Sequence, residues 1–385
     1  ARMEVPHEIT RYRIETDSDR LAVGYRALLN TLKAFPPKAS YISLAHAFLP
    51  PLYRWLNGTT RYMLHFVGET GTRKTSYALV FQGFYGDFPE PPEGWRSTIN
   101  HIEMMGWHTK DALLLIDDFK PRYVKLQDFT QLVHNYANGL SRGRLNRDAT
   151  IRNSRPMRCV IISTGEDIPE GEASVLSRMI VLKMRNEDID LAALQAAQDN
   201  VASLPAVMAD FLTWLPGEMD TTKRIEGWRD EYINTLKGTQ TNPGRIAHNM
   251  AHNRLAWTVL GDYLVARGIW NMAERQRKDA EYIIVSNEVI QEMGTQVTEE
   301  KASSVFLATL KAMLASGDAA FLSTNLIKTP ADEAIEKSGK KILGWKDSKG
   351  YYLGSAGGTA YHEVEKWLRQ EGKSLGFSER ALWEQ

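Results

Sequence analysis

The middle of the chain alternates short apolar runs with segments of helical periodicity. The runs are Tyr62–Val67, Ala112–Ile116, Cys159–Ile162 and Met179–Leu182, and each has the length of a buried strand. Residues 83–95 hold three prolines and three glycines and are expected to be irregular. Strands that alternate with helices predict an α/β fold, in which helices cover both faces of a parallel sheet.

The two flanks of this region read as mostly helical. Residues 1–61 carry apolar residues at helical spacing, with a stop at Pro36-Pro37. A second helix over 41–56 must kink or break at Pro50-Pro51. Residues 185–300 are also helical, with a long helix predicted over Arg245–Arg267.

The tail after residue 300 differs from the helical region before it. Helices are predicted over 301–314 and 359–370, and Ser378 caps a further helix. Two short strands, 342–345 and 351–353, flank a turn over 346–350. Helices with a two-stranded ribbon suggest a small winged-helix-like module, for which duplex binding and mere packing are both open.

Composition narrows the class of protein. With 385 residues, 43% hydrophobic and 24% charged, the chain is expected to be globular, with two or three domains. Net charge is zero, so nucleic-acid binding requires local basic clusters. A single cysteine, Cys159, excludes internal disulfides and favours a reducing, cytoplasmic setting. No membrane span or signal peptide is visible, and both ends look like cuts in a longer polypeptide.

The first chemical motif follows the run Tyr62–Val67. A glycine-containing loop leads into Lys74-Thr75 and then into a predicted helix, the context of a phosphate-binding P-loop. Lys74 is expected to reach the β- and γ-phosphates of ATP, and the Thr75 hydroxyl to hold Mg²⁺. Where glycine usually precedes the lysine, this chain has Arg73. The predicted nucleotide-binding residues are Gly68, Glu69, Thr70, Gly71, Thr72, Arg73, Lys74 and Thr75.

Two acids, Asp117 and Asp118, end the next apolar run. Ligands of open α/β sheets bind at the edge where strands end. Asp117 is therefore expected to hold Mg²⁺ and Asp118 to orient and deprotonate the attacking water. A solvated turn is the simpler alternative.

A cluster of arginines follows between residues 142 and 158. It holds six arginines and one acid, Asp148. A hairpin turning at 146–148 would present a positive surface to a phosphate backbone, although a subunit contact is also possible. No aromatic residue interleaves the arginines, so base stacking by this hairpin is not supported. The candidate DNA contacts are Arg142, Arg144, Arg147 and Arg152.

Five further polar residues, at three places along the chain, are candidates. Thr164 or Ser163, at the end of the run that starts at Cys159, could bond the γ-phosphate or the water. Arg178 precedes the last apolar run and could point at a neighbouring subunit's γ-phosphate. Arg245, with Arg254 second, could touch phosphates from a lid, and both could equally be structural.

The order of these motifs resembles that of AAA+ helicases of the superfamily 3 and minichromosome-maintenance type. Residues 136–144 and 163–166 look more closely like helicase-like ATPases of mobile elements and phages, which often follow a primase or primase-polymerase domain. The resemblance implies Lys74 and Thr75 as Walker A, Asp117 and Asp118 as Walker B, Thr164 (or Ser163) as sensor 1, and Arg178 as an arginine finger. Many such ATPases have glutamate where this chain has Asp118.

The expected function is thus that of an ATP- and Mg²⁺-dependent DNA helicase or translocase, the motor part of a mobile-element or phage replication protein. It is expected to act as a hexameric ring on single-stranded or forked DNA. Two alternatives are an ATP-switched DNA-binding or loading module with little hydrolysis, and an AAA+ protein remodeller. The expected parts are a helical N-terminal segment (1–60), the AAA+ core (61–185), a helical lid (186–300) and the winged-helix-like module (301–385).

Overall fold

The computed structural model describes residues 7–56, 60–141, 154–168, 173–215, 222–236, 243–299, 302–324, 329–354 and 359–370, with residues 375, 379 and 382. The chain forms two compact units, Ala1–Gln296 and Val297–Gln385. The four-part division expected from the sequence is finer than this and stays a prediction.

A five-stranded sheet organises the first unit. Its strand order is β2-β3-β4-β1-β5, and all the ladders are parallel. The strands are β1 (Met63–Val67), β2 (Glu93–Gly94), β3 (Leu113–Phe119), β4 (Val160–Gly165) and β5 (Met179–Lys183). Every residue of β1 and β4 is buried, as the apolar runs predict. The predicted mixed α/β fold with a parallel sheet is confirmed.

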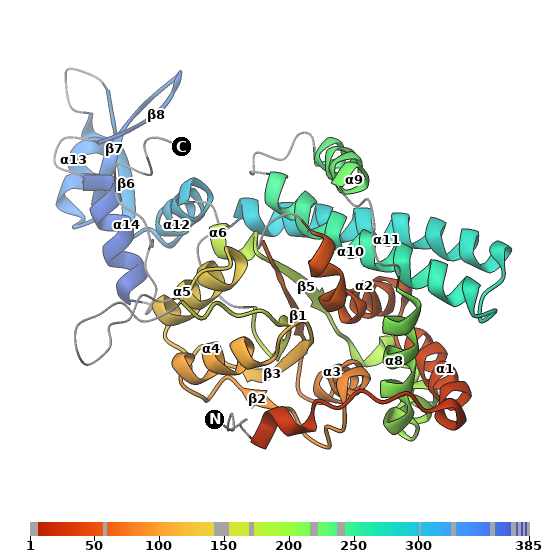
Figure 1. Ribbon diagram of the computed structural model, residues 1–385. Helices are drawn as coiled ribbons and strands as arrows, with labels where there is room; N and C mark the ends of the chain where they lie inside the picture. Colours follow the sequence, from red (N-terminus) through yellow and green to blue (C-terminus); the bar gives the residue numbers. More distant parts are fainter. Residues whose placement is uncertain are drawn as a thin grey trace. The chain divides into compact units, whose positions relative to one another are not determined.

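Helices cover both faces of this sheet. They are α3 (Lys74–Gln82), α4 (Ile99–His108), α5 (Leu126–Ala137) and α6 (Ala173–Leu176), with the 3₁₀ turn η3 (Gly83–Tyr85) after α3. Figure 1 shows α3 on one side of the sheet and α4 and α5 on the other. The connection from β1 to β2, which contains α3, crosses the sheet in one direction, and the later connections cross it in the opposite direction. Because crossovers between parallel strands are right-handed, the two directions place their helices on opposite faces of the sheet.

Further helices surround the sheet in the same unit. They are η1 (His7–Arg11), α1 (Ser18–Lys33), α2 (Pro37–Phe48), η2 (Pro50–Trp55), η4 (Asn186–Asp188), α7 (Leu191–Gln198), η5 (Val201–Ser203), α8 (Leu204–Trp214), α9 (Thr222–Thr235), α10 (Pro243–Ala266) and α11 (Met272–Glu299), whose last residues belong to the second unit. The predicted break at Pro50 is confirmed, since α2 ends at Phe48. None of the helices in the described ranges combines the length and hydropathy needed to cross a bilayer.

The long helix α10 is tied to the rest of the unit by a buried amide. The Asn253 side chain donates to the carbonyl oxygen of Ile42 on α2 and to the hydroxyl of Tyr62, just ahead of β1. The Tyr282 hydroxyl of α11 donates to the other side of the same amide. Buried polar groups that are satisfied in this way fix how neighbouring helices pack.

The second unit has its own core and a three-stranded sheet. Its elements are α12 (Ala302–Ser316), β6 (Ala319–Ser323), α13 (Pro330–Lys337), β7 (Lys341–Asp347), β8 (Gly350–Leu353) and α14 (Thr359–Gln370). The predicted ribbon is the antiparallel pair β7–β8, and β6 adds to it in parallel. The strand β6 and the helix α13 were not expected from the sequence. The winged-helix assignment stays a prediction, and Ser378 lies outside the described residues.

Candidate nucleotide site

The loop after β1 has the backbone of a phosphate cradle. It leaves β1 at Val67 and enters α3 at Lys74, so the N-terminus of α3 faces the loop. Gly71 has a φ of +94° with open space around it, and Arg73 has a φ of 56° in the left-handed region. A side chain at Gly68 would meet the Met184 carbonyl oxygen at 2.3 Å. The usual glycine before the lysine is therefore explained by backbone conformation, which Arg73 adopts at a cost.

Lys74 turns back into this loop. Its ammonium donates to the carbonyl oxygens of Gly68 at 2.7 Å and Glu69 at 2.8 Å, and to the Thr72 hydroxyl at 3.1 Å. Only 9% of the residue is exposed. Burial lowers the pKa of Lys74, while the carboxylates of Glu166, Asp117 and Asp118 act in the opposite direction. The loop thus holds a cation at its centre, where phosphate oxygens would have to lie.

Three oxygens converge beside Lys74. The hydroxyl of Thr75, at the start of α3, donates to Asp117 Oδ1 at 2.7 Å. The Thr164 hydroxyl, near the end of β4, donates to the same oxygen. Because β3 and β4 are parallel neighbours, their carboxyl ends meet at this edge. Hydroxyl and carboxylate oxygens are the ligands that Mg²⁺ prefers, so the residues present fit a magnesium ion.

Asp118 occupies a bulge at the end of β3. The ladder to β4 shifts between Ile116 and Phe119, and Asp118 has a φ of 61°. Its backbone N–H donates to the Thr164 hydroxyl oxygen at 3.3 Å. Its carboxylate pairs with Lys120 at 3.2 Å and with Arg96 at 3.5 Å. The bulge re-aims this side chain relative to Asp117, and the two cations were not anticipated from the sequence.

Ser163 points away from this cluster. Successive residues of a strand face opposite sides of the sheet, so Thr164 meets Asp117 while Ser163 lies between His65, at 3.0 Å, and Trp95, at 2.9 Å. His65 Nε2 lies 3.0 Å from the Asp167 carbonyl oxygen, which accepts only, so this nitrogen carries the proton. Burial lowers the pKa of His65 to about 4. Of the two predicted alternatives, the structure brings only Thr164 to the loop and Asp117.

Glu166 is a further acid at the same edge, absent from the predicted site. It follows β4 directly, and its carboxylate accepts a hydrogen bond from the Thr70 hydroxyl in the loop. That hydrogen bond, with nearby Lys120 and Lys74, lowers the pKa of Glu166. The sequence could have identified Glu166 in the same way as Asp117, because both acids follow an apolar run with the length of a buried strand.

Arg178 lies at the opposite edge of the sheet. Its carbonyl oxygen accepts from the Met63 N–H, at the beginning of β1, whereas the loop starts where β1 ends. Its guanidinium donates to the Ser174 carbonyl oxygen of α6. Five strand residues span roughly 15 Å, so the structure does not bring Arg178 to the loop of its own chain.

Arg245 and Arg254 are not brought to the loop either. Arg245 donates to the Asn138 side chain at 3.3 Å. Asn138 caps α5 beside Ala137, whose carbonyl accepts from Arg61 ahead of β1, so Arg245 also belongs to the far edge. Arg254 pairs with Glu231 at 2.8 Å. The predicted hairpin arginines Arg142, Arg144, Arg147 and Arg152 lie outside the described residues.

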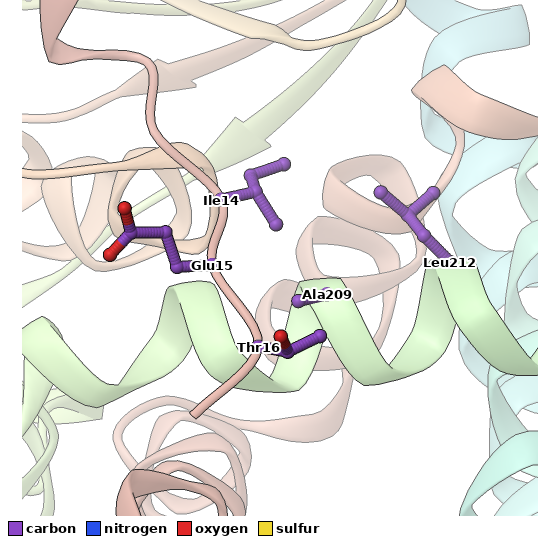
Figure 2. A pocket seen from close by; sticks show the side chains of 5 residues that line it. All are labelled: Ile14, Glu15, Thr16, Ala209 and Leu212. Carbon is purple, nitrogen blue, oxygen red and sulfur yellow. The ribbon is translucent and has the colours of Figure 1, made fainter. Parts of the chain in front are cut away.

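A hollow of about 670 Å³ lies elsewhere in the first unit. Figure 2 shows its lining, with Ile14, Glu15 and Thr16 on the segment ahead of α1, and Ala209 and Leu212 on α8. Its five lining side chains include a carboxylate and no cation, which is unsuited to a triphosphate. The loop after β1, with Lys74 at its centre, is therefore a better candidate for binding phosphates than this hollow.

Comparison with known proteins agrees with the fold. Residues 30–156 match the protein-family model described as "Domain of unknown function (DUF927)". Among curated proteins, none has a matching sequence. The chain is similar to the solved structure "SCCmec type IV Cch - active helicase", with a TM-score of 0.61 and 13% identity over 97% of this chain and 67% of that one. An apo form of the NrS-1 C-terminal region is more distant, with a TM-score of 0.34 and 12% identity over 75% of this chain and 70% of that one. The chain therefore shares the fold of the first of these solved structures.

Proposed function

We propose that this chain is the motor part of an ATP-driven DNA helicase or translocase of the AAA+ type. It would work as a ring of identical subunits, with six as the expected number, in the replication of a mobile element or phage. The observation that carries the proposal is the convergence of Thr75, Thr164 and Asp117 beside Lys74 at the end of β1. The helicase-like fold supports it.

Each residue of the cluster has a distinct proposed role towards Mg-ATP. Lys74 exchanges its loop carbonyl partners for β- and γ-phosphate oxygens. Thr75 and Asp117 hold Mg²⁺, which would neutralise charge on those oxygens. Thr164, already bonded to Asp117, orients the attacking water, and Asp118 accepts its proton.

The arginines act outside the nucleotide site of their own chain in this proposal, either on a neighbouring subunit or on DNA. Arg178 stabilises the developing charge on a neighbouring subunit's γ-phosphate, which agrees with its position far from its own loop. Arg245, on the same edge, contacts the phosphates of that neighbouring site. Arg142, Arg144, Arg147 and Arg152 contact the DNA backbone in the central channel.

A steady-state ATPase assay with and without single-stranded DNA tests the proposal. Lys74→Ala is expected to lose nucleotide binding and turnover, because Lys74 is the cation that the loop holds at its centre. Lys33→Ala, on the exposed end of α1, is the matched control and should retain both. Full ATPase activity of Lys74→Ala would exclude the loop as the nucleotide site.

An ATP-switched DNA-binding module is the second candidate. It is favoured by the contacts of Asp118, whose carboxylate is already paired with Lys120 and Arg96, and which is one methylene shorter than glutamate. This carboxylate must leave both cations before it can approach an attacking water. DNA-stimulated turnover with strand displacement supports the motor, whereas nucleotide-dependent DNA binding without turnover supports the switch.

A further inference from the structure

One face of the sheet in the second unit exposes aromatic side chains. Trp345 of β7 lies directly opposite Tyr352 of β8 in the antiparallel register, so both side chains stand on the same face. They are 47% and 45% exposed. Leu322 of β6, paired with Trp345, is half-buried and continues this face. We call Leu322, Trp345 and Tyr352 the aromatic face.

The hydrophobic core lies on the other side of this sheet. Phe321 and Leu343 are buried in a cluster with residues of α12 and α14, including Phe306 and Val364. The aromatic face is therefore not needed to cover that core. Neighbouring aromatic side chains that stay about half exposed are a candidate site for a binding partner.

The charge around this face selects the kind of partner. The stretch 337–350 holds five lysines and a single acid, Asp347. That acid is engaged within the hairpin, because it accepts from the backbone N–H groups of Lys349 and Gly350 and from the Tyr352 hydroxyl. All five lysines are exposed. Lys341 is paired with Glu363 of α14 at 3.6 Å, and Lys346, opposite Tyr351, stands on the other face of the strand pair. The hairpin as a whole is therefore basic and complements a polyanion. The lysines are Lys337, Lys340, Lys341, Lys346 and Lys349.

We propose that the aromatic face binds single-stranded nucleic acid. Unpaired bases stack on Trp345 and Tyr352, and the neighbouring lysines contact the phosphates. A duplex is a poor ligand, because its bases are already stacked on one another. This site goes beyond the proposed motor function, since it needs neither ATP nor the arginines of residues 142–152.

Crosslinking tests the location of binding directly. The full chain is irradiated with a single-stranded thymidine oligonucleotide that carries 5-iodouracil, and the crosslinked peptides are identified by mass spectrometry. Crosslinks at Trp345 or Tyr352 are expected, in the wild type and equally in the Lys74→Ala variant. If crosslinks map only to other segments, the proposal is wrong.

Fluorescence anisotropy with the same oligonucleotide measures the contribution of stacking. It is done in a background in which Arg142, Arg144, Arg147 and Arg152 are alanine, which separates this site from the proposed channel. The double variant Trp345→Ala, Tyr352→Ala should bind about ten-fold or more weakly. The double variant Trp345→Phe, Tyr352→Phe keeps two aromatic rings and should stay within about two-fold. Equal binding by the alanine and phenylalanine variants overturns the proposal.

The lysines supply a second readout in the same background. Lys346→Gln with Lys349→Gln should reduce the slope of affinity against salt concentration by about one to two ion equivalents. Lys311→Gln, on the exposed side of α12, is the control and should leave it unchanged. If the alanine variant instead dissociates an oligomer and keeps its affinity for DNA, the aromatic face binds a second copy and the proposal is wrong.

Discussion

At the residue scale, the sequence predicted which strand ends carry the site residues, but not which of two adjacent residues faces the site, because that depends on strand register. Lys74, Thr75 and Asp117 were expected to meet, because a loop after one parallel strand and acids after another share one edge. Ser163 and Thr164 could not be told apart from the sequence, because the face of each depends on the register of β4. Glu166 was missed since its strand was read only for hydroxyl groups.

Substituting the two hydroxyl residues separates their roles. Thr164→Val keeps the shape but removes the bond to Asp117, so ATP turnover should fall roughly ten- to hundred-fold with folding unchanged. Ser163→Ala leaves His65 and Trp95 without their shared partner, which should cost about 1–3 kcal/mol of unfolding free energy and little activity. ATPase assays and denaturant unfolding of both variants check this, and the reverse pattern would contradict the assignment of Thr164.

The backbone conformation of Arg73 predicts how a substitution there changes the free energy of unfolding. Its φ of 56° is a left-handed conformation, which glycine adopts freely. Arg73→Gly should therefore raise the unfolding free energy by roughly 0.5–1 kcal/mol, measured from the urea midpoint at unchanged slope. Arg185→Gly is the control, because Arg185 has an extended φ of −125°, and there the change should be destabilising. A loss of stability at both positions would show that Arg73 gains more from its side chain than its backbone costs.

At the element scale, segments with a clear apolar, periodic or turn pattern were predictable, and segments without one were not. The helix α10 and the ribbon β7–β8 lie within a few residues of their predicted bounds. The strand β2 has two residues, too few to show any period, and it lies among the prolines and glycines of 83–95. The strand β6 is an Ala-rich run of five residues, and its pairing with β7 is a long-range contact that no local pattern encodes.

A contact between the helix α2 and the strand β4 predicts that the stability of the fold depends on pH. His46 Nε2 lies 2.9 Å from the Ile161 carbonyl oxygen, and burial lowers the pKa of His46 to about 4. The folded state therefore binds this proton less readily than the unfolded state, whose histidine has a pKa of about 6.5. The contribution of neutral His46 to the free energy of unfolding is therefore fully present above pH 6.5. It declines as the pH falls towards 4, by about 2 kcal/mol between pH 6.5 and 5.

Urea unfolding at pH 7 and pH 5 measures this effect. His46→Gln should show a loss of stability on acidification that is smaller than that of the wild type by about 2 kcal/mol. The remaining loss of stability on acidification in this variant includes that from His65 and His252, because burial lowers their pKa values too. His362→Gln, on the exposed side of α14, is the control. An unchanged pH dependence in His46→Gln would show that His46 takes up its proton without opening the contact to β4.

At the scale of the whole molecule, the sheet separates the two groups of residues that the proposed ring would bring together. The nucleotide cluster is at the edge where the strands end, and Arg178 is at the edge where they begin. From the sequence, the order of motifs implied a site shared between subunits, but only the strand register shows that Arg178 and Lys74 of one chain are far apart. The proposed ring joins one edge of each subunit to the other edge of its neighbour, a heterologous contact that closes by rotation.

Mixing two inactive variants tests this arrangement. Arg178→Ala should bind ATP normally and hydrolyse it very slowly. Lys74→Ala should neither bind ATP nor hydrolyse it. In a mixed ring, the intact loop of an Arg178→Ala subunit can face the intact arginine of a Lys74→Ala subunit, and with random assembly of equal amounts about a quarter of the interfaces have this pairing. The mixture should therefore recover turnover up to about a quarter of the wild-type rate. A mixture that stays as inactive as its components, although size-exclusion chromatography shows mixed assembly, would contradict a site shared between subunits. If Arg178→Ala alone hydrolyses ATP at the normal rate, Arg178 is a structural residue that holds α6 through Ser174.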